Sequence, residues 1–368
     1  MKKRTHGASL YYATDKNVFD ALNQHKVDTP TVMRLFQRRN IIVGKKSPRE
    51  DLARYFARLT HDYYDHREIA ARLGISSRRE RITSMDVTSV GDTEDLQVAV
   101  EQLKQEMEAN GDVVQVSQDG ENLIIQVQYS TMDYKRSEFA QVQIRDGTVE
   151  FIKTVNGFVV RNTQNEYLND VRETLLGKME KVAEAPIIKV TVSLFDIPSS
   201  KFRSKFFHEL ASKMSGYVRR DVTEVYVYKA KPEAEEREDS DEAAPDDHET
   251  HIERVFLRGN GVTRSELLNG LLDEDDYYIV KMGWTATEMM GIGNVFDIEA
   301  LFTDPKDCTG FSFILSGVFP MEDGKISTRR RSPFKHEIDT ISRVIEAKSR
   351  ELVIDLRKEY ATLESGGT

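Results

Sequence analysis

The residues in this chain whose types and spacing favour a defined chemistry are basic ones near the N-terminus. Gly44-Lys45-Lys46 is followed at once by Ser47-Pro48-Arg49, and Glu50 stands three residues after Ser47. This spacing predicts a capping box with proline at the first helical position. A helix N-terminus presents N–H groups and partial positive charge, and neighbouring lysines add to it. The pattern therefore predicts a phosphate-binding site where the loop meets the helix.

The surroundings of this loop resemble the SAP-type helix–extension–helix DNA-binding module over residues 29–60. One helix carries Leu35, the loop follows, and a second helix carries Leu52 and Leu59. Proteins of that type bind duplex DNA through basic residues of the loop and of the second helix's start. The sequence departs from the pattern because Ser47-Pro48 lengthens the gap between the lysines and Leu52. The resemblance implies nucleic-acid contacts by Arg38, Arg39, Lys45, Lys46, Arg49 and Arg54.

A second resemblance lies at residues 65–82. Arg67 to Ser76 resembles the first helix and turn of a helix-turn-helix, with small Ala70 followed four residues later by Gly74. The resemblance implies a recognition helix that begins at Ser76 and presents three arginines to the groove. These are Arg78, Arg79 and Arg81. The alternative is a single helix that ends at a glycine C-cap, because the β-prone residues from Ile82 onward leave the second helix very short.

One set of residues suggests metal chemistry. Asp119, a strand at 123–129 and then Asp133-Tyr134-Lys135 resemble the order of a PD-(D/E)xK nuclease. Two carboxylates in such a site hold a divalent metal, and the lysine steadies the attacking water. The alternative is that Asp119 and Asp133 belong to turns, since Asp119 precedes Gly120. We found no other catalytic pattern, so we expect no enzymatic activity, no cofactor and no metal.

Charge is distributed unevenly along the chain. Residues 1–85 contain 18 Lys or Arg and 9 Asp or Glu, a net charge of +9, whereas the whole chain carries −10. The remainder therefore carries −19, of which −8 lies in residues 231–250. This asymmetry is typical of a nucleic-acid-binding end joined to a body with other partners.

Composition limits the class of protein. A chain of 368 residues exceeds one average domain, and its 39% hydrophobic content suffices for folded cores. No apolar run approaches the roughly 20 residues of a membrane span, and no apolar stretch follows the basic N-terminus as in a secretory signal. The single Cys308 excludes an intramolecular disulfide. We therefore expect a cytoplasmic protein without a membrane partner.

Apolar periodicity predicts a small helical module followed by a mixed body. Helices are expected at 17–23, after Thr29-Pro30, after Ser47 and at 65–73. For residues 83–182 the sequence pattern predicts a strand at 83–90, a helix at 93–109, strands at 113–116, 123–129, 139–144 and 149–155, and a helix at 168–182. Gln118-Asp-Gly-Glu and Arg145-Asp-Gly-Thr are typical hairpin turns.

The rest of the chain continues this mixed pattern. It predicts strand 187–194, helix 199–214, strand 222–228, strand 252–257, helix 263–272, strands at 277–282, 295–302 and 311–319, and a final helix 333–360. The acidic segment 231–250 predicts a disordered linker or loop. The expected fold is α+β, with a module at 1–82, domains at 83–230 and 251–368, and a linker between them. The two domains share an order of elements that suggests related sub-domains.

These patterns favour a non-enzymatic DNA-binding protein, or the DNA-recognising subunit of a larger prokaryotic assembly of regulatory, mobile-element or antiviral phage-defence type. Duplex DNA is the expected ligand, and the acidic body is the expected surface for a protein partner. Two alternatives stay open at this point: a metal-dependent nuclease, and a protein–protein adaptor without affinity for nucleic acid.

Overall fold

The computed structural model describes residues 13–24, 27–73, 80–88, 93–230, 252–273, 276–289, 293–322 and 324–366. The described chain is α+β, as predicted. It divides into two compact units built from interleaved segments. Unit 1 takes residues 1–79, 88–158 and 165–187, and unit 2 takes residues 80–87, 159–164 and 188–368. Two short segments of the N-terminal half therefore belong to the C-terminal unit, unlike the sequential domains expected from the sequence.

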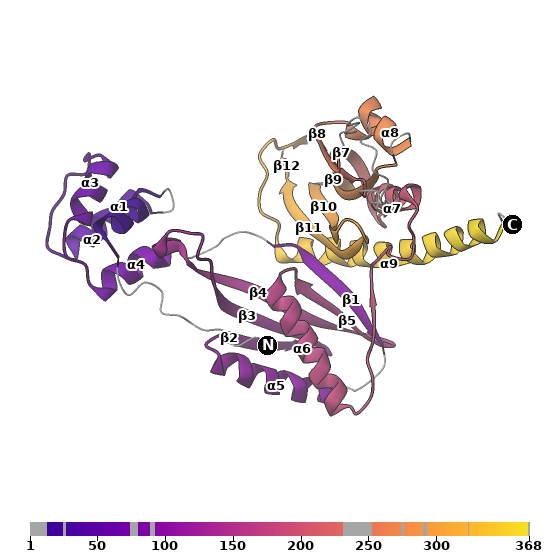
Figure 1. Cartoon of the computed structure of the whole chain (residues 1–368), viewed down its shortest axis with the longest axis horizontal. Coiled ribbons are helices and arrows are strands. Elements are labelled where there is room, and N and C mark those ends of the chain that lie inside the picture. The colour runs from indigo at the N-terminus through magenta and orange to yellow at the C-terminus, as the bar shows by residue number, and fades with distance from the viewer. Residues whose placement is uncertain are drawn as a thin grey trace, which may run out of the picture. The chain divides into compact units, whose positions relative to one another are not determined.

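Four helices form the N-terminal part of unit 1 (Figure 1). They are α1 (Asp15–Asn23), α2 (Thr29–Gln37), α3 (Arg49–Ala57) and α4 (Tyr63–Leu73). Apolar residues at helical spacing meet in one core, in which Leu35, Phe36 and Phe56 are fully buried. Phe36 and Phe56 pack edge to face, with ring centroids 5.1 Å apart. The predicted helical module is confirmed.

The helix caps differ from those expected. The side chain of Asp28, the residue before Thr29, caps α2 by accepting a hydrogen bond from the Thr31 N–H at 2.9 Å. Helix α3 begins at Arg49 with Pro48 at its N-cap and has no side-chain cap. The capping box predicted at Ser47 is therefore wrong. The Ser47 N–H instead closes a turn onto the Gly44 carbonyl at 3.1 Å, which delays the helix start by one residue.

The rest of unit 1 consists of three antiparallel strands and two helices. Its elements are α5 (Thr93–Ala109), β2 (Val113–Asp119), β3 (Asn122–Met132), the 3₁₀ turn η1 (Glu138–Ala140), β4 (Val142–Thr154) and α6 (Glu166–Val182). Gly120, with φ of +62°, makes the predicted tight turn between β2 and β3. The second predicted turn is wrong, because Asp146 and Gly147 pair with Gln128 and Val127 inside the continuous strand β4.

The strands of unit 2 follow one another in the hydrogen-bonded order β5-β1-β11-β10-β9-β7-β8, and β6 pairs with β1. Its strands are β1 (Ile82–Thr88), β5 (Gly157–Thr163), β6 (Ile188–Thr191), β7 (Tyr217–Tyr228), β8 (Arg254–Arg258), β9 (Tyr278–Glu288), β10 (Val295–Asp304) and β11 (Thr309–Phe319). A separate ladder joins β12 (Met321–Glu322) and β13 (Lys325–Ile326). Strand β5 was not predicted from the sequence.

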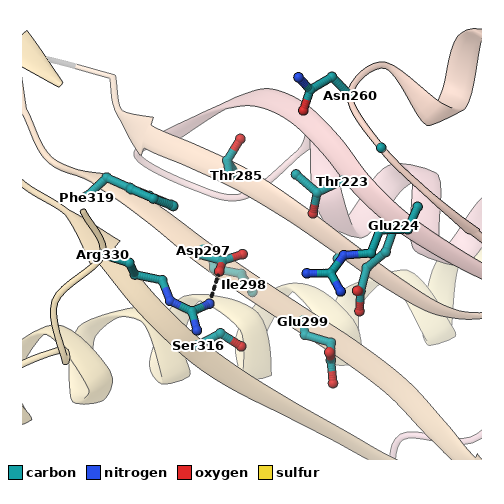
Figure 2. Close-up of a pocket in the computed structure, with 13 residues that line it drawn as sticks. Thr223, Glu224, Asn260, Thr285, Asp297, Ile298, Glu299, Ser316, Phe319 and Arg330 are labelled. Atoms are coloured by element: carbon teal, nitrogen blue, oxygen red, sulfur yellow. Dashed lines mark hydrogen bonds and ion pairs between the residues drawn. The ribbon is translucent and has the colours of Figure 1, made fainter. Parts of the chain in front are cut away.

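One face of the unit 2 sheet forms the core. Its helices are α7 (Ser200–Ser212) and α9 (Lys335–Gly366), and the 3₁₀ turn η2 (Val262–Arg264) and α8 (Glu266–Asp273) follow β8. Trp284 of β9, Phe206 of α7 and Ile345 of α9 share this core and are fully buried. The alternate residues of the central strands point to the other face, which is polar and carries Thr285, Asp297 and Glu299 (Figure 2).

A buried ion pair holds the long helix α9 to the sheet. The guanidinium of Arg161 on β5 donates two hydrogen bonds to the Glu346 carboxylate, at 2.7 and 2.8 Å, and both side chains are at most 6% exposed. Next to it, Asp86 of β1 pairs with Arg350 at 2.9 Å, and burial raises the pKa of Asp86. These contacts fix the position of α9 along β1 and β5.

The acidic segment 231–250 lies outside the described residues, but its ends show what it connects. Strands β7 and β8 pair directly and antiparallel, with Glu224 opposite Arg258. The segment therefore joins two neighbouring strands of one sheet. Residues on both sides of the segment belong to unit 2, which agrees with the loop that the sequence left open and not with a linker between two domains.

Candidate nucleic-acid interface

The loop between α2 and α3 has the order helix, extended segment, helix. After α2 ends at Gln37, residues 41–43 run without regular structure and lead into the turn that Gly44 and Ser47 close. Lys45 and Lys46 occupy the middle of this turn, and both are exposed. Ile42 beside them is 96% exposed. The loop therefore presents two adjacent lysines and an apolar side chain to solvent.

Lys45 and Lys46 differ from Arg38, Arg39, Arg49 and Arg54 because, across the described residues, neither lysine makes an ion pair or a side-chain hydrogen bond. The turn also leads into a helix start that no side chain caps. An external oxyanion at this place would meet two uncompensated ammonium groups and the positive end of α3.

The remaining predicted cations of α3 are compensated inside the protein. Arg54 pairs with Glu50 at 2.7 Å and lies 3.7 Å from Asp51, both in the first turn of the same helix. The Arg49 guanidinium donates to the backbone carbonyls of Leu22 and Gln24, and its Nη2 lies 2.7 Å from the Leu22 oxygen. Arg49 therefore ties the end of α1 to the start of α3, and its charge is directed inward.

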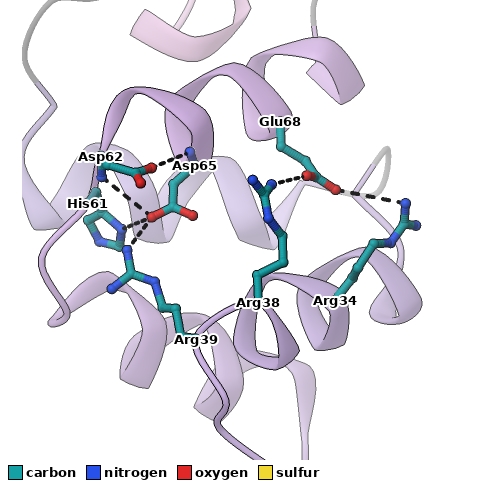
Figure 3. A network of polar contacts seen from close by, with 7 residues as sticks. All are labelled: Arg34, Arg38, Arg39, His61, Asp62, Asp65 and Glu68. Carbon is teal, nitrogen blue, oxygen red and sulfur yellow. Dashed lines mark hydrogen bonds and ion pairs between the residues drawn. The ribbon is translucent and has the colours of Figure 1, made fainter.

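The cations of α2 are compensated by α4 (Figure 3). Arg38 pairs with Glu68 at 2.5 Å, and Arg34 approaches the same carboxylate at 3.8 Å. Arg39 pairs with Asp65, whose side chain is 7% exposed, and its guanidinium also lies over the Phe56 ring, 5.2 Å from the centroid. Arg38 and Arg39 therefore fasten α4 to α2.

His61 completes the network around Asp65. Its Nδ1 lies 3.8 Å from the Asp65 carboxylate, and the ring is 5.0 Å from the Phe56 ring between centroids. Burial, assisted by the nearby Arg39 guanidinium, lowers the pKa of His61 despite a backbone hydrogen bond at Ala57 and the Asp65 charge. His61 is therefore neutral at pH 7 and belongs to the core of the helical module.

The helix-turn-helix candidates divide into two groups. Helix α4 ends at Leu73, and Arg78 and Arg79 lie outside the described residues. Arg81 lies in unit 2 just before β1, where its Nε donates to Glu299 of β10 at 3.0 Å. Arg81 therefore takes part in an internal ion pair of the sheet.

The residues of the nuclease-like pattern are not brought together. Asp119 ends β2 at the hairpin, whereas Asp133 follows the far end of the 11-residue strand β3. A strand of this length holds the two carboxylates on the order of 30 Å apart, too far for one metal ion. Hydrogen bonds from the Arg136 side chain and the Lys135 N–H lower the pKa of Asp133 and fix it in a local turn.

The described residues contain no group of three or more His, Cys, Asp or Glu side chains placed to hold a metal ion. Within the same ranges, no helix has the length and apolar character needed to cross a membrane. No family model and no curated protein matches the chain.

One group of charged residues had no signal in the sequence. Glu224, Lys281 and Glu299 come from three strands, and they converge on the polar face of the unit 2 sheet. Their spacing along the chain carries no motif, because strand register brings them together. Alternation within β9 and β10 indicates which residues share a face, but it does not indicate which strands are neighbours.

Proposed function

We propose that the protein binds duplex DNA through the loop of residues 44–48 at the start of α3. The observation that carries the proposal is the exposure of Lys45 and Lys46 without an internal partner among the described residues, beside an uncapped helix N-terminus. Phosphate groups of a duplex match this arrangement, since lysine ammonium groups neutralise phosphates and helix N–H groups donate to their oxygens.

The internal contacts narrow the proposed interface. Arg38, Arg39, Arg49 and Arg54 were all expected to contact DNA from the sequence, but each is engaged within the helical module. A DNA phosphate would have to compete with a carboxylate or carbonyl already in contact. The proposal therefore assigns the principal phosphate contacts to Lys45 and Lys46, and gives the arginines a supporting role in holding the helices that present them.

The mode of binding follows from the chemistry of the loop. Two lysines and backbone N–H groups address the phosphate backbone, which is the same for every sequence. We therefore expect affinity that depends strongly on salt and weakly on base sequence. The acidic remainder of the chain repels DNA, so binding is confined to the helical module.

The test is a salt titration of duplex binding by the full chain and by a Lys45→Glu/Lys46→Glu variant, followed by fluorescence anisotropy. Loss of two phosphate contacts should reduce the slope of log affinity against log salt by about 2 and weaken binding at least ten-fold or so near 0.1 M salt. Arg49 is left intact because its side chain donates to two backbone carbonyls at the end of α1.

The control variant Lys181→Glu/Lys358→Glu changes the net charge by the same amount at two exposed lysines on other helices. It should bind DNA nearly as well as the original chain. If both double variants bind DNA equally weakly, the loss of affinity comes from the change in net charge alone. If the Lys45→Glu/Lys46→Glu variant binds DNA as well as the original chain, the loop is not part of the interface.

A further inference from the structure

A cavity of about 490 Å³ lies on the polar face of the unit 2 sheet (Figure 2). Its volume falls within the range of sites that hold small molecules. Its lining comes from five strands or their ends, together with Arg330 of the segment before α9. Of the 13 lining residues only Ile298 and Phe319 have apolar side chains, so the cavity suits a hydrophilic ligand.

Strand register explains why a hollow forms here. Gly283 of β9 stands opposite Glu224 of β7 on one side and opposite Glu299 of β10 on the other. The Glu224 side chain lies across Gly283, where a Cβ atom would come within 2.5 Å of its Cγ. Arg258 of β8 stands opposite Glu224 and extends the same row. The row therefore reads arginine, glutamate, glycine, glutamate across four strands.

The carboxylates of the cavity are already compensated. Lys281 Nζ lies 2.7 Å from a carboxylate oxygen of Glu224 and 2.9 Å from one of Glu299. The Glu299 carboxylate also accepts a hydrogen bond from the Arg81 guanidinium. Although burial opposes it, the contact with Lys281 and Arg81 lowers the pKa of Glu299, so the carboxylate stays ionised. Asp297 pairs with Arg330 at 2.5 Å. A cationic ligand would have to displace one of these internal cations.

Arg258 is the lining cation that lacks such compensation. Its side chain is exposed, and it makes no ion pair or hydrogen bond with any of the described residues. Asn260, two residues later, also lines the cavity and is exposed. An arginine fork beside an amide is well suited to a phosphate, whose oxygens accept two parallel N–H bonds.

The rest of the lining suits hydroxyl groups. Thr223, Thr285 and Ser316 offer hydroxyls that donate or accept. The carboxylate oxygens of Asp297 and Glu299 accept hydrogen bonds from a ligand's hydroxyls. Figure 2 places Asn260 and Phe319 at opposite ends of the cavity. A ligand that extends from the Arg258 end toward Phe319 would meet these groups in turn.

We propose that this cavity binds a small phosphorylated sugar, either as a sugar phosphate or as a mononucleotide, with Arg258 holding the phosphate. The carboxylates fixed by Lys281 and Arg330 accept from the sugar hydroxyls. In a mononucleotide the base would lie toward the Phe319 ring. This site belongs to unit 2 and is independent of the DNA-binding loop proposed for unit 1.

The test is isothermal titration calorimetry of the full chain with ribose 5-phosphate and with AMP. Ribose, inorganic phosphate and spermidine serve as comparison ligands. One or both phosphorylated sugars should bind, and ribose should not. Arg258→Ala should weaken binding about ten-fold or more, as expected for a lost charge-assisted arginine–phosphate contact. Arg254→Ala is the matched control, because Arg254 lies on the same strand but outside the cavity lining.

The two sources of the phosphorylated sugar are distinguished by their relative affinity. Tighter binding of AMP that Phe319→Leu reduces to the level of ribose 5-phosphate would assign the site to a nucleotide, whereas equal affinity would assign it to a sugar phosphate. The proposal is overturned if neither ligand binds at millimolar concentration, if Arg258→Ala binds as well as the original chain, or if spermidine binds in their place.

Discussion

The helical module of unit 1 and the polar sheet face of unit 2 use charge in opposite ways. In the module, Arg34 of α2 and the two arginines that follow this helix lie against two acidic residues of α4, so ion pairs join the helices, whereas Lys45 and Lys46 stay exposed on a loop. In the sheet, carboxylates and cations from neighbouring strands compensate one another inside a cavity and leave Arg258. The comparison teaches that the candidates for ligand binding are the Lys and Arg side chains that make no ion pair within the protein. The number of basic residues in a segment does not identify them.

The largest expected effect concerns the ion pair that joins two helices of the module. Asp65→Ala leaves the Arg39 guanidinium without its carboxylate in a nearly buried place, so we expect a loss of about 3 kcal/mol in the stability of the helical module. Hydrogen exchange of the α2 and α4 amides in the full chain measures it. Asp20→Ala, which removes an exposed pair with Lys16, should cost less than about 1 kcal/mol. Equal losses would mean that the pair does not hold the helices.

The sheet offers the corresponding test of compensation. Lys281→Met leaves Glu224 and Glu299 facing each other, which should cost about 2 kcal/mol at pH 7. The pKa of Glu299 is held low by Lys281 and Arg81, and without Lys281 it should rise. Protonation of Glu299 then relieves the repulsion from Glu224, so the stability that the variant loses should become smaller as the pH falls.

Trp284, the only tryptophan of the chain, is fully buried in unit 2 and reports its urea unfolding. Lys205→Met is the control for the Lys281 variant, since its partner Glu359 is largely exposed. A loss of stability that is the same at pH 7 and pH 5 would contradict the role assigned to the two carboxylates.

A smaller effect is expected on the pH dependence of the stability of the helical module. Burial lowers the pKa of His61, so the folded state keeps the ring neutral while the unfolded chain takes up a proton near its ordinary pKa of about 6.5. Stability that is present above about pH 6.5 is therefore lost as the pH falls below this value. Protection factors of the α3 and α4 amides should show this loss, and His61→Gln should remove the dependence. His336→Gln, at an exposed position, should leave it unchanged.

The smallest expected effect is on stability when the leftover cations are removed. Lys45→Met/Lys46→Met and Arg258→Ala should each change the unfolding free energy by less than about 0.5 kcal/mol, because their side chains are exposed and make no internal ion pair with described residues. Thermal unfolding of the two variants checks this. A large destabilisation would show that these residues also stabilise the fold. It would contradict the distinction between cations that make internal ion pairs and cations that do not.

Features determined by neighbouring residues could be predicted from the sequence. Pro30 marked the start of α2, and Asp119-Gly120 marked the turn between β2 and β3, because caps and tight turns depend on a few adjacent residues. The predicted turn at Asp146-Gly147 failed because pairing with β3 keeps that segment extended. Here the partner strand overrides the local preference.

The candidate sites show the same limit. The lysine loop was visible in the sequence because its residues are contiguous. That Arg39 is compensated by Asp65, 26 residues later, could not be deduced without knowing how α4 packs on α2. The cavity could not be predicted from the sequence, because Glu224, Gly283 and Glu299 become neighbours only through the register of the strands.

The placement of β1 has a consequence for synthesis of the chain. Ile82 of β1 pairs with Phe313 of β11, so the first strand of unit 2 is made long before its neighbour exists. At about 5–20 residues per second, this delay lasts on the order of 10–50 seconds. During that time unit 1 has all of its segments, which end at residue 187, while unit 2 does not. Cleavage of the chain at a single position therefore cannot separate the two units. A fragment that begins at residue 188 would lack β1 and β5. Strand β11 would then be an edge strand that is prone to pair with other chains.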